Sequence, residues 1–150
     1  MRRTCCVFFL LLALFVSMGS LEGQEFPPMG GQAGGQDVGF SLEQNYPNPF
    51  NPETRIPFQL FDEIFVDGRP ATVSVRIYNL LLQYVASPTT VDHPSGEGVP
   101  ILELEFPFPG RYEAYWDGRD QSGAFVASGV YILELTVNGQ SQILKMFVTK

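Results

Sequence analysis

Apolar and polar residues alternate with a period of two along most of the chain after residue 40. In residues 71–79, Val73, Val75 and Ile77 occupy one side and polar residues occupy the positions between them. No segment after residue 40 sustains the 3.6-residue apolar period of a helix. Because side chains two residues apart lie on the same face of a strand, the pattern predicts strands with one buried face.

Seven segments have this alternation or a β-rich composition. Seven short strands in about 110 residues are typical of two packed sheets. The sequence therefore predicts an all-β fold, a seven-stranded antiparallel immunoglobulin-like sandwich. The first segment contains Pro57, which cannot donate a main-chain hydrogen bond, so we expect that strand at a sheet edge. The predicted strands are residues 54–61, 71–79, 83–86, 101–106, 112–116, 129–137 and 140–149.

The last two predicted strands are joined by Asn138 and Gly139. Asn-Gly readily adopts the two positive φ angles of a type I′ turn, whose twist matches that of paired strands. A two-residue turn also determines the register: Leu133 is expected opposite Leu144, and likewise Tyr131 opposite Met146. The turn residues and the apolar pattern therefore predict the same hairpin.

The start of the chain predicts a secretory signal peptide. Residues 1–3 are a basic start, residues 5–16 are an apolar run, and small residues follow, with cleavage expected after Gly19 or Gly23. A retained membrane anchor is the alternative, but a span needs about 20 apolar residues, so we expect no stable membrane span after cleavage. The expected organisation is a signal peptide (1–23), a flexible Gly/Pro/Gln-rich tether (24–40) and one domain (41–150).

The charge of the chain is acidic, with 9 Lys and Arg against 16 Asp and Glu and a net charge of −7. Nucleic-acid binding needs clustered basic residues, so nucleic acid is excluded as an expected partner. Both cysteines, Cys5 and Cys6, lie in the predicted signal peptide. The mature domain is therefore expected to fold without a disulfide.

A proline-rich motif opens the predicted domain. Three prolines in six residues fix φ and remove main-chain donors. We expect a stiff, extended strap whose two aromatic residues pack on the sheets, and a proline-rich ligand for a partner's groove is the alternative. The motif consists of Tyr46, Pro47, Asn48, Pro49, Phe50, Asn51 and Pro52.

A second motif, Trp116-Asp117-Gly118, follows a predicted aromatic strand and continues to Gly123. A calcium loop begun by Asp117 and Asp120 is one interpretation, although the spacing is not that of an EF-hand. The other is a tight turn, in which aspartate accepts from nearby main-chain N–H groups and Trp116 anchors the core.

No combination of residues predicts an enzyme. The single histidine, His93, is expected to be solvated in a polar loop, and the sequence contains no nucleophile elbow, zinc-protease motif or phosphate-binding loop. The carboxylates are dispersed, so no glycosidase pair can be chosen among them. We expect no catalytic residue, no cofactor-binding residue, no cofactor and no metal site.

Several blocks of the sequence together resemble a known family. They are residues 41–52 (SLEQNYPNPFNP) with Thr54 and Ile56, residues 75–80, residues 109–112 with 116–120, residues 126–131, and residues 145–148. In this order, and over about 110 residues, they resemble the C-terminal sorting domain of proteins exported by the bacterial type IX secretion system. That domain is similar to the immunoglobulin-like domain of the flagellar hook-capping protein.

The resemblance implies a sandwich whose last strands are recognised by outer-membrane export machinery. It implies protein partners in that machinery or in the cell envelope, and a location in the periplasm, on the cell surface or outside the cell. A terminal strand offers main-chain groups to which a partner strand can pair. The implied recognition residues are Lys145, Met146, Phe147, Val148, Thr149 and Lys150.

Three departures from the family pattern leave alternatives open. Leu82 stands where the family usually has glycine, residues 87–108 form a longer acidic segment, and no large cargo precedes the domain. A structural or adhesive assembly module of the cell envelope, related to the hook-cap domain, is therefore the alternative function. A remnant of a longer exported protein is a third.

Overall fold

The computed structural model describes residues 38–150, which belong to one compact unit beginning at Gly34. The predicted signal peptide and nearly all of the predicted tether lie outside the described residues. The whole described core comes from residues between Phe40 and Val148. A polypeptide of residues 34–150 therefore contains a complete core and is expected to fold by itself. Within the described residues, no helix is long and apolar enough to cross a membrane.

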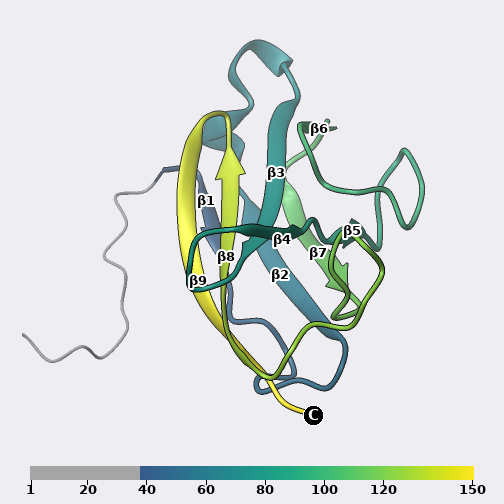
Figure 1. The fold of residues 1–150 in the computed structure, drawn as a ribbon. Helices are drawn as coiled ribbons and strands as arrows, with labels where there is room; N and C mark the ends of the chain where they lie inside the picture. Colours follow the sequence, from purple (N-terminus) through teal and green to yellow (C-terminus); the bar gives the residue numbers. More distant parts are fainter. Residues whose placement is uncertain (1–37) are drawn as a thin grey trace, which may run out of the picture. The chain divides into compact units, whose positions relative to one another are not determined.

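The chain forms two antiparallel sheets, which confirms the predicted all-β class (Figure 1). The first sheet has the order β1-β2-β7-β5 and the second the order β4-β3-β8-β9, with β6 pairing on the same side of β3 as β4. Two short 3-10 turns, η1 (Asp62–Ile64) and η2 (Val66–Gly68), link the sheets between β2 and β3. The strands are β1 (Phe40–Leu42), β2 (Thr54–Leu60), β3 (Ala71–Tyr78), β4 (Tyr84–Ala86), β5 (Thr89–Thr90), β6 (Leu104–Phe106), β7 (Gly110–Trp116), β8 (Gly129–Val137) and β9 (Gln140–Val148).

The two sheets enclose one hydrophobic core. Alternate residues of β2 and β3, such as Ile56, Phe58, Val73 and Val75, are completely buried, as the period-two pattern predicts. Contacts between aromatic rings connect the sheets. The ring centroids of Phe58 (β2) and Phe106 (β6) lie 5.7 Å apart in an edge-to-face arrangement.

The prediction of seven strands was wrong, because the described residues form nine. The additional strands, β1 and β5, have three and two residues. Each is stabilised by pairing with a longer strand, β1 with β2 and β5 with β7, rather than by an apolar pattern of its own. The predicted strand at 101–106 is reduced to β6, because Glu103 adopts a positive φ of 54° and turns the chain.

The expectation that Pro57 lies in an edge strand was also wrong, since β2 lies between β1 and β7. The Pro57 carbonyl accepts a hydrogen bond from the Glu43 N–H, which places Pro57 just beyond the end of β1. The N and C=O of one strand residue point to the same side. The side of Pro57 that lacks an N–H therefore faces β1, at the point where the pairing of β1 with β2 ends. The hydrogen bonds between β2 and β7 are not affected.

The predicted C-terminal hairpin is confirmed. Asn138 and Gly139 have φ angles of 48° and 85°, and the register places Leu133 opposite Leu144 and Tyr131 opposite Met146. The Asn138 side chain also accepts a hydrogen bond of 2.9 Å from the N–H of Thr72, at the start of β3. The turn thus joins the hairpin to its neighbouring strand.

Leu82 lies in the turn between β3 and β4 with a positive φ of 57°. This conformation costs an L-residue about 1–2 kcal/mol, whereas glycine adopts it freely but loses more entropy on folding. We expect Leu82→Gly to raise the free energy of unfolding by up to about 1 kcal/mol, measured by urea denaturation. Leu81→Gly is the matched control, because Leu81 has no positive φ, and it should lower the free energy. Equal losses from both variants would contradict the strain at Leu82.

Candidate functional site

The proline-rich motif forms a folded loop, so the prediction of an extended strap was wrong. Its ends are brought together by two hydrogen bonds of 2.9 Å between the main chains of Tyr46 and Arg55. Inside the loop, the buried Asn45 side chain donates to the Pro47 carbonyl and to the Thr54 hydroxyl. The peptide bonds preceding Pro47, Pro49 and Pro52 are cis. The loop is therefore a compact element that positions Phe50.

Phe50 fills the end of the core nearest the C-terminus. Its side chain is only 1% exposed, and its ring lies 5.4 Å from that of Trp116, edge to face. Trp116 in turn lies 5.8 Å from the ring of Tyr131 and donates from Nε1 to the Arg119 carbonyl. The loop, the end of β7 and the start of β8 are thus packed around one aromatic cluster. Phe50 packs on the sheets and Trp116 anchors the core, as expected, whereas Tyr46 is 45% exposed and does not pack as predicted.

The same loop pairs with the end of the C-terminal strand. The Phe50 N–H donates to the Phe147 carbonyl and the Thr149 N–H donates to the Phe50 carbonyl, each at 2.9 Å. Phe50 and Val148 form a parallel bridge. The Asn48 side chain accepts from the Phe147 N–H at 3.0 Å. The proline-rich loop therefore covers the outer edge of β9 over its last residues.

The turn after Trp116 closes against the loop. Gly118 has a φ of 74°, and a methyl group at this position would lie 2.2 Å from the Pro52 carbonyl oxygen. The Asp117 carboxylate accepts from the Arg119 N–H, and Asp120 accepts from Ser122 and Ala124. The Ser122 hydroxyl also donates to Asp120, and this bond contributes most to a lowered pKa of Asp120, together with the bonds from the main chain. Both aspartates act as turn residues, as the tight-turn interpretation predicts, and residues 38–150 contain no group of three metal-binding side chains.

The outer edge of β9 is open over its central part. Phe147 turns its N–H and C=O away from β8, and by the alternation of an antiparallel ladder so do Ile143 and Lys145. The outward-facing N–H and C=O groups of Ile143 and Lys145 have no hydrogen-bonding partner among residues 38–150. Gln142 closes the other end: its side-chain amide accepts from Leu42 at 2.8 Å and donates to Phe40 at 3.0 Å, joining β9 to β1. We call residues 143–145 the open edge.

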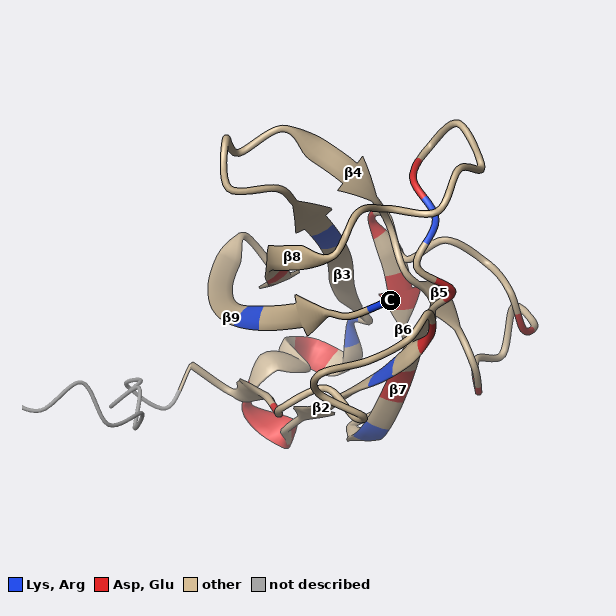
Figure 2. Cartoon of the chain, turned by 60° about the horizontal axis from the view of Figure 1, so that its bottom comes forward, with Lys and Arg blue, Asp and Glu red and all other residues tan. Residues whose placement is uncertain are grey.

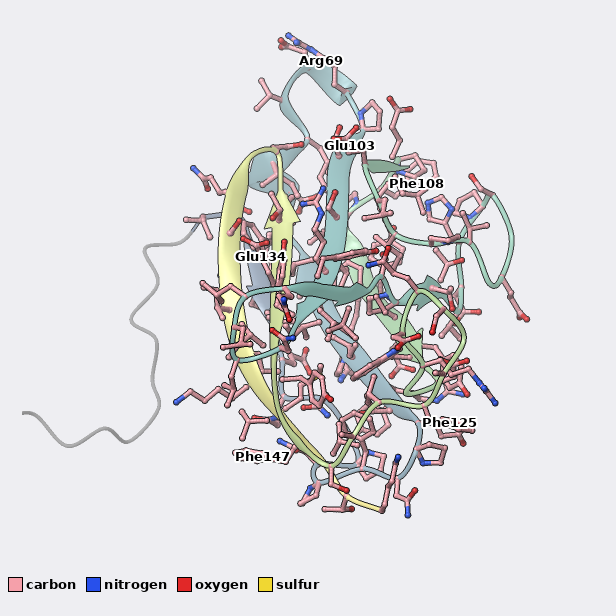
Figure 3. The ribbon with its side chains drawn as sticks, viewed as in Figure 1. Arg69, Glu103, Phe108, Phe125, Glu134 and Phe147 are labelled. Atoms are coloured by element: carbon pink, nitrogen blue, oxygen red, sulfur yellow. The ribbon has the colours of Figure 1, made fainter. Side chains whose placement is uncertain are left out.

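The six predicted recognition residues do not lie on one surface. Met146 and Val148 are buried in the core, whereas Lys145, Phe147, Thr149 and Lys150 are exposed. Figure 3 shows Phe147 at the surface. Phe147 is 43% exposed and lies opposite Val130 on the outer face of the second sheet. A partner would therefore contact alternate side chains of this segment, together with the open edge beside them.

A small groove of about 260 Å³ lies beside the end of β9. It is formed where the proline-rich loop, the turn after Trp116 and the last residues of the chain meet. Phe125 on its rim is 49% exposed, with the Arg119 guanidinium 3.7 Å above its ring. The lining residues are Asn51, Pro52, Gly118, Phe125, Val126, Val148, Thr149 and Lys150.

A polar cluster on the first sheet attaches the proline-rich loop to β7. The Tyr46 hydroxyl donates to the Glu113 carboxylate, and the Arg55 guanidinium lies 3.1 Å from the same carboxylate. The bond from Tyr46 and the proximity of Arg55 lower the pKa of Glu113, and the bond to Glu113 raises the pKa of Tyr46. These contacts tie the proline-rich loop to the middle of β7.

His93 is half-buried, contrary to the expectation of a solvated side chain. Its ring packs edge to face on Phe106, 4.5 Å between centroids, and its two nitrogens bond to the Glu105 carbonyl and the Ser95 N–H. Thr90 bonds to Gly96, Gly98 and Val99 at the base of the same loop. The long segment after β5 is therefore an ordered projection.

Three features of the surface were not predicted from the sequence: two long-range hydrogen-bonding contacts and one run of exposed leucines. The bonds of Asn48 to Phe147 and of Gln142 to β1 join residues about 100 positions apart, and no local pattern announces them. The third feature had a readable signal: three consecutive leucines, Leu80 to Leu82, between two polar residues. Such a run is unusual on a strand-connecting turn.

Two solved structures resemble this chain over part of its backbone. One is dimeric latent PorU from Porphyromonas gingivalis, with 18% identity and a TM-score of 0.47 over 73% of this chain and 9% of that one. The other is PorZ, an essential surface component of the type IX secretion system of the same bacterium, with 19% identity and a TM-score of 0.42 over 73% of this chain and 11% of that one. No family model and no curated protein matches the sequence. The chain spans about a tenth of each of these two proteins, so their activities and partners are not assigned to it.

Proposed function

We propose that the domain is a non-enzymatic, immunoglobulin-like sorting module that outer-membrane export machinery recognises through the C-terminal hairpin. The support is the convergence of sequence blocks that resemble a sorting domain. Phe50 of the first block contacts Trp116 of the third, and its main chain pairs with Phe147 of the last. Blocks separated by up to about 100 residues therefore build one structure, the supported end of β9.

The observation that carries the proposal is the open edge of β9. Unpaired strand edges are templates for strand addition, and native proteins usually cover them. Here the covering is selective: the proline-rich loop protects residues 147–149 and Gln142 protects the edge near β1. A partner strand can therefore pair with Ile143 and Lys145, and the main chain supplies the affinity.

The exposed side chains beside the open edge supply specificity. Ile143 is 68% exposed and Phe147 is 43% exposed, with Lys145 between them on the same face. An apolar–basic–apolar sequence at alternate positions matches the way a strand-adding partner reads side chains. Within the resembling segment 145–150, the proposal thus assigns recognition to Lys145, Phe147 and the adjacent edge.

Export of a reporter tests the proposal. Residues 34–150 are fused behind a signal peptide and a reporter, in a bacterium that has the type IX machinery. The wild-type fusion should reach the cell surface or the medium. Lys145→Pro removes an outward-facing N–H without affecting the bonds to β8, so we expect at least a tenfold loss of exported reporter. Lys145→Ala keeps the N–H and removes only a side chain that adds specificity, so its loss of export should be severalfold smaller than that of Lys145→Pro.

The outcomes separate three explanations. Equal loss of export with both variants would show that the lysine charge, not the main chain, is recognised. Export of Lys145→Pro at the wild-type level would reject the open edge as the site. Retention of the wild-type reporter in the periplasm would reject the sorting function. Circular dichroism of each purified domain establishes that the variants are folded.

An assembly role in the cell envelope is the second candidate. The observation that favours it is the ordered projection after β5, which is held at its base by Thr90 and by the packing of His93 on Phe106. Loops positioned by a rigid scaffold commonly carry binding residues. Failure of the wild-type reporter to leave the periplasm would favour this role over sorting.

A further inference from the structure

The turn between β3 and β4 exposes three consecutive leucines. Leu80, Leu81 and Leu82 are 65%, 78% and 73% exposed. Single exposed apolar residues are ordinary on a protein surface, but adjacent ones mark interaction sites. We call these residues the leucine tip. In Figure 2 the turn that carries them is drawn apart from β8 and β9, above them.

The leucine tip is held in one conformation by its flanking residues. The Asn79 side chain accepts from the N–H groups of Leu81 and Gln83 at 2.9 and 3.0 Å. The Leu82 N–H donates to the Asn79 carbonyl at 2.9 Å, and the Asn79 N–H donates to the Gln83 carbonyl at 3.0 Å. Two main-chain donors of the tip, those of Leu81 and Leu82, are thus satisfied within the turn, which lowers the cost of an apolar surrounding.

The residues that form and flank the tip in the sequence carry no charge, and two of them are tyrosines. Residues 77–91 contain no Asp, Glu, Lys or Arg, and the turn and β4 show neither acidic nor basic colour in Figure 2. Tyr78 and Tyr84 flank the base of the turn, with ring centroids 6.2 Å apart. Charged residues lie beside this base. Glu134 accepts from the Tyr78 hydroxyl, and Asp120 lines the same groove as Asn79. Arg76 and Glu103 line a groove with the two tyrosines, so three acidic groups and one basic group lie near the tip.

We propose that the leucine tip inserts into the surface of a zwitterionic lipid bilayer. Leucine is among the residues that enter bilayers most favourably, and tyrosine is enriched at the level of the headgroups. The leucine tip would lie in the apolar part of the bilayer, and Tyr78 and Tyr84 at its base would lie at the level of the headgroups. A protein partner is less well matched, because interface hot spots are enriched in Trp, Tyr and Arg and poor in Leu.

The charge of the domain specifies the kind of lipid. Residues 38–150 contain seven Lys and Arg and thirteen Asp and Glu, and Glu134 and Asp120 lie near the tip. Anionic lipids would repel this surface, and no basic cluster is present in residues 77–91 to attract them. Binding therefore depends on apolar insertion and should be insensitive to salt.

The backbone of Leu82 supports a role for its side chain. Leu82 has a φ of 57°, a conformation that glycine adopts without strain. Strained positions of this kind cluster at functional sites. The turn alone would favour glycine at position 82. The leucine side chain there adds a third exposed leucine beside Leu80 and Leu81, so a role of the side chain explains why leucine occupies this position.

Vesicle binding tests the proposal on residues 34–150, because the apolar run at 5–16 would itself bind lipid. The domain should co-sediment with phosphatidylcholine vesicles, with the same bound fraction at low and high salt and no gain when phosphatidylserine is added. Leu81→Asp should reduce the partition coefficient at least tenfold. Phe108→Asp is the matched control: Phe108 is 66% exposed on the β6–β7 loop, and this variant should bind as wild type.

A second variant tests insertion by the appearance of a fluorescence signal, so that the proposal does not depend only on the loss of binding in Leu81→Asp. Leu81→Trp places a reporter at the tip, while the native Trp116 is 2% exposed. Vesicles should shift its emission to shorter wavelength, and brominated lipid should quench it. Absence of both changes, equal loss of binding in Leu81→Asp and Phe108→Asp, or a requirement for anionic lipid would each overturn the proposal. Normal export of Leu81→Asp with lost vesicle binding would leave the sorting function standing.

Discussion

A Gly118→Ala variant is expected to lose about 2–5 kcal/mol of stability. Two costs add at this position. The φ of 74° is strained for any residue with a Cβ, and the new methyl carbon would lie 2.2 Å from the Pro52 carbonyl oxygen. The main chain of the Gly118 turn fixes the position of this methyl carbon, and the Pro52 carbonyl is itself main chain, so neither can move without displacing one of the two loops. Denaturation by guanidinium chloride measures the loss.

Gly123→Ala is the control that separates the two costs. Gly123 belongs to the same turn and has a φ of 82°, but a methyl group there would meet no atom within 4 Å. Its cost should be that of the conformation alone, about 1–2 kcal/mol. If the two variants lose equal stability, the close approach of Gly118 to Pro52 contributes nothing, and the proposed contact between the two motifs is contradicted.

A Phe50→Ala variant is expected to lose about 3–5 kcal/mol, the usual cost of removing a buried phenylalanine. Phe50 is 1% exposed and packs on Trp116. Since folded domains are stable by only about 5–15 kcal/mol, this loss is a large part of the total. Urea denaturation measures it. Phe108→Ala, at a 66% exposed position, should change stability by less than about 0.5 kcal/mol.

The same variant should loosen the end of β9 specifically. The Thr149 N–H donates to the Phe50 carbonyl, so displacement of the loop exposes this amide to solvent. Hydrogen exchange at Thr149 should therefore accelerate more than exchange at Leu133, which pairs with Leu144 inside the hairpin. Equal acceleration at both sites would mean that Phe50 stabilises the core without supporting the edge of β9.

This support decides how much of β9 a partner can reach. With the loop in place, the main chain of residues 147–149 is occupied, whereas the open edge at 143–145 has no partner among residues 38–150. A module recognised by strand addition benefits from such a limit, because a short open edge favours one register and discourages unspecific pairing of long edges.

Local interactions explain why the strands and the hairpin could be predicted from the sequence. Alternation in β3 depends on residues two positions apart, and the Asn138-Gly139 turn depends on two φ angles. The register of β8 and β9 follows from that turn by counting. Seven of the nine strands carry such a signal, whereas β1 and β5 are too short for one and exist because β2 and β7 lie beside them.

The candidate site could be predicted only in part, for the same reason. The motif residues and the C-terminal segment are visible in the sequence, but their contacts are not. The prediction of an extended strap was wrong because proline restricts φ but does not determine where the chain turns back. The hydrogen bonds between Tyr46 and Arg55 determine that point. The prediction that Pro57 lies in an edge strand was wrong because the missing N–H of Pro57 faces β1 beyond the end of their ladder. No strand needs a hydrogen bond from Pro57 on that side, so β2 can still lie between β1 and β7.

By itself, the sequence determined an all-β domain, its longer strands, the hairpin register and the residues available at the C-terminus. The tertiary structure alone decided which main-chain groups of that terminus remain free. Phe50 closes one end of the β9 edge and Gln142 closes the other, through contacts across about 100 residues. Local patterns cannot encode such contacts, because they arise only when the two sheets pack and bring distant segments together.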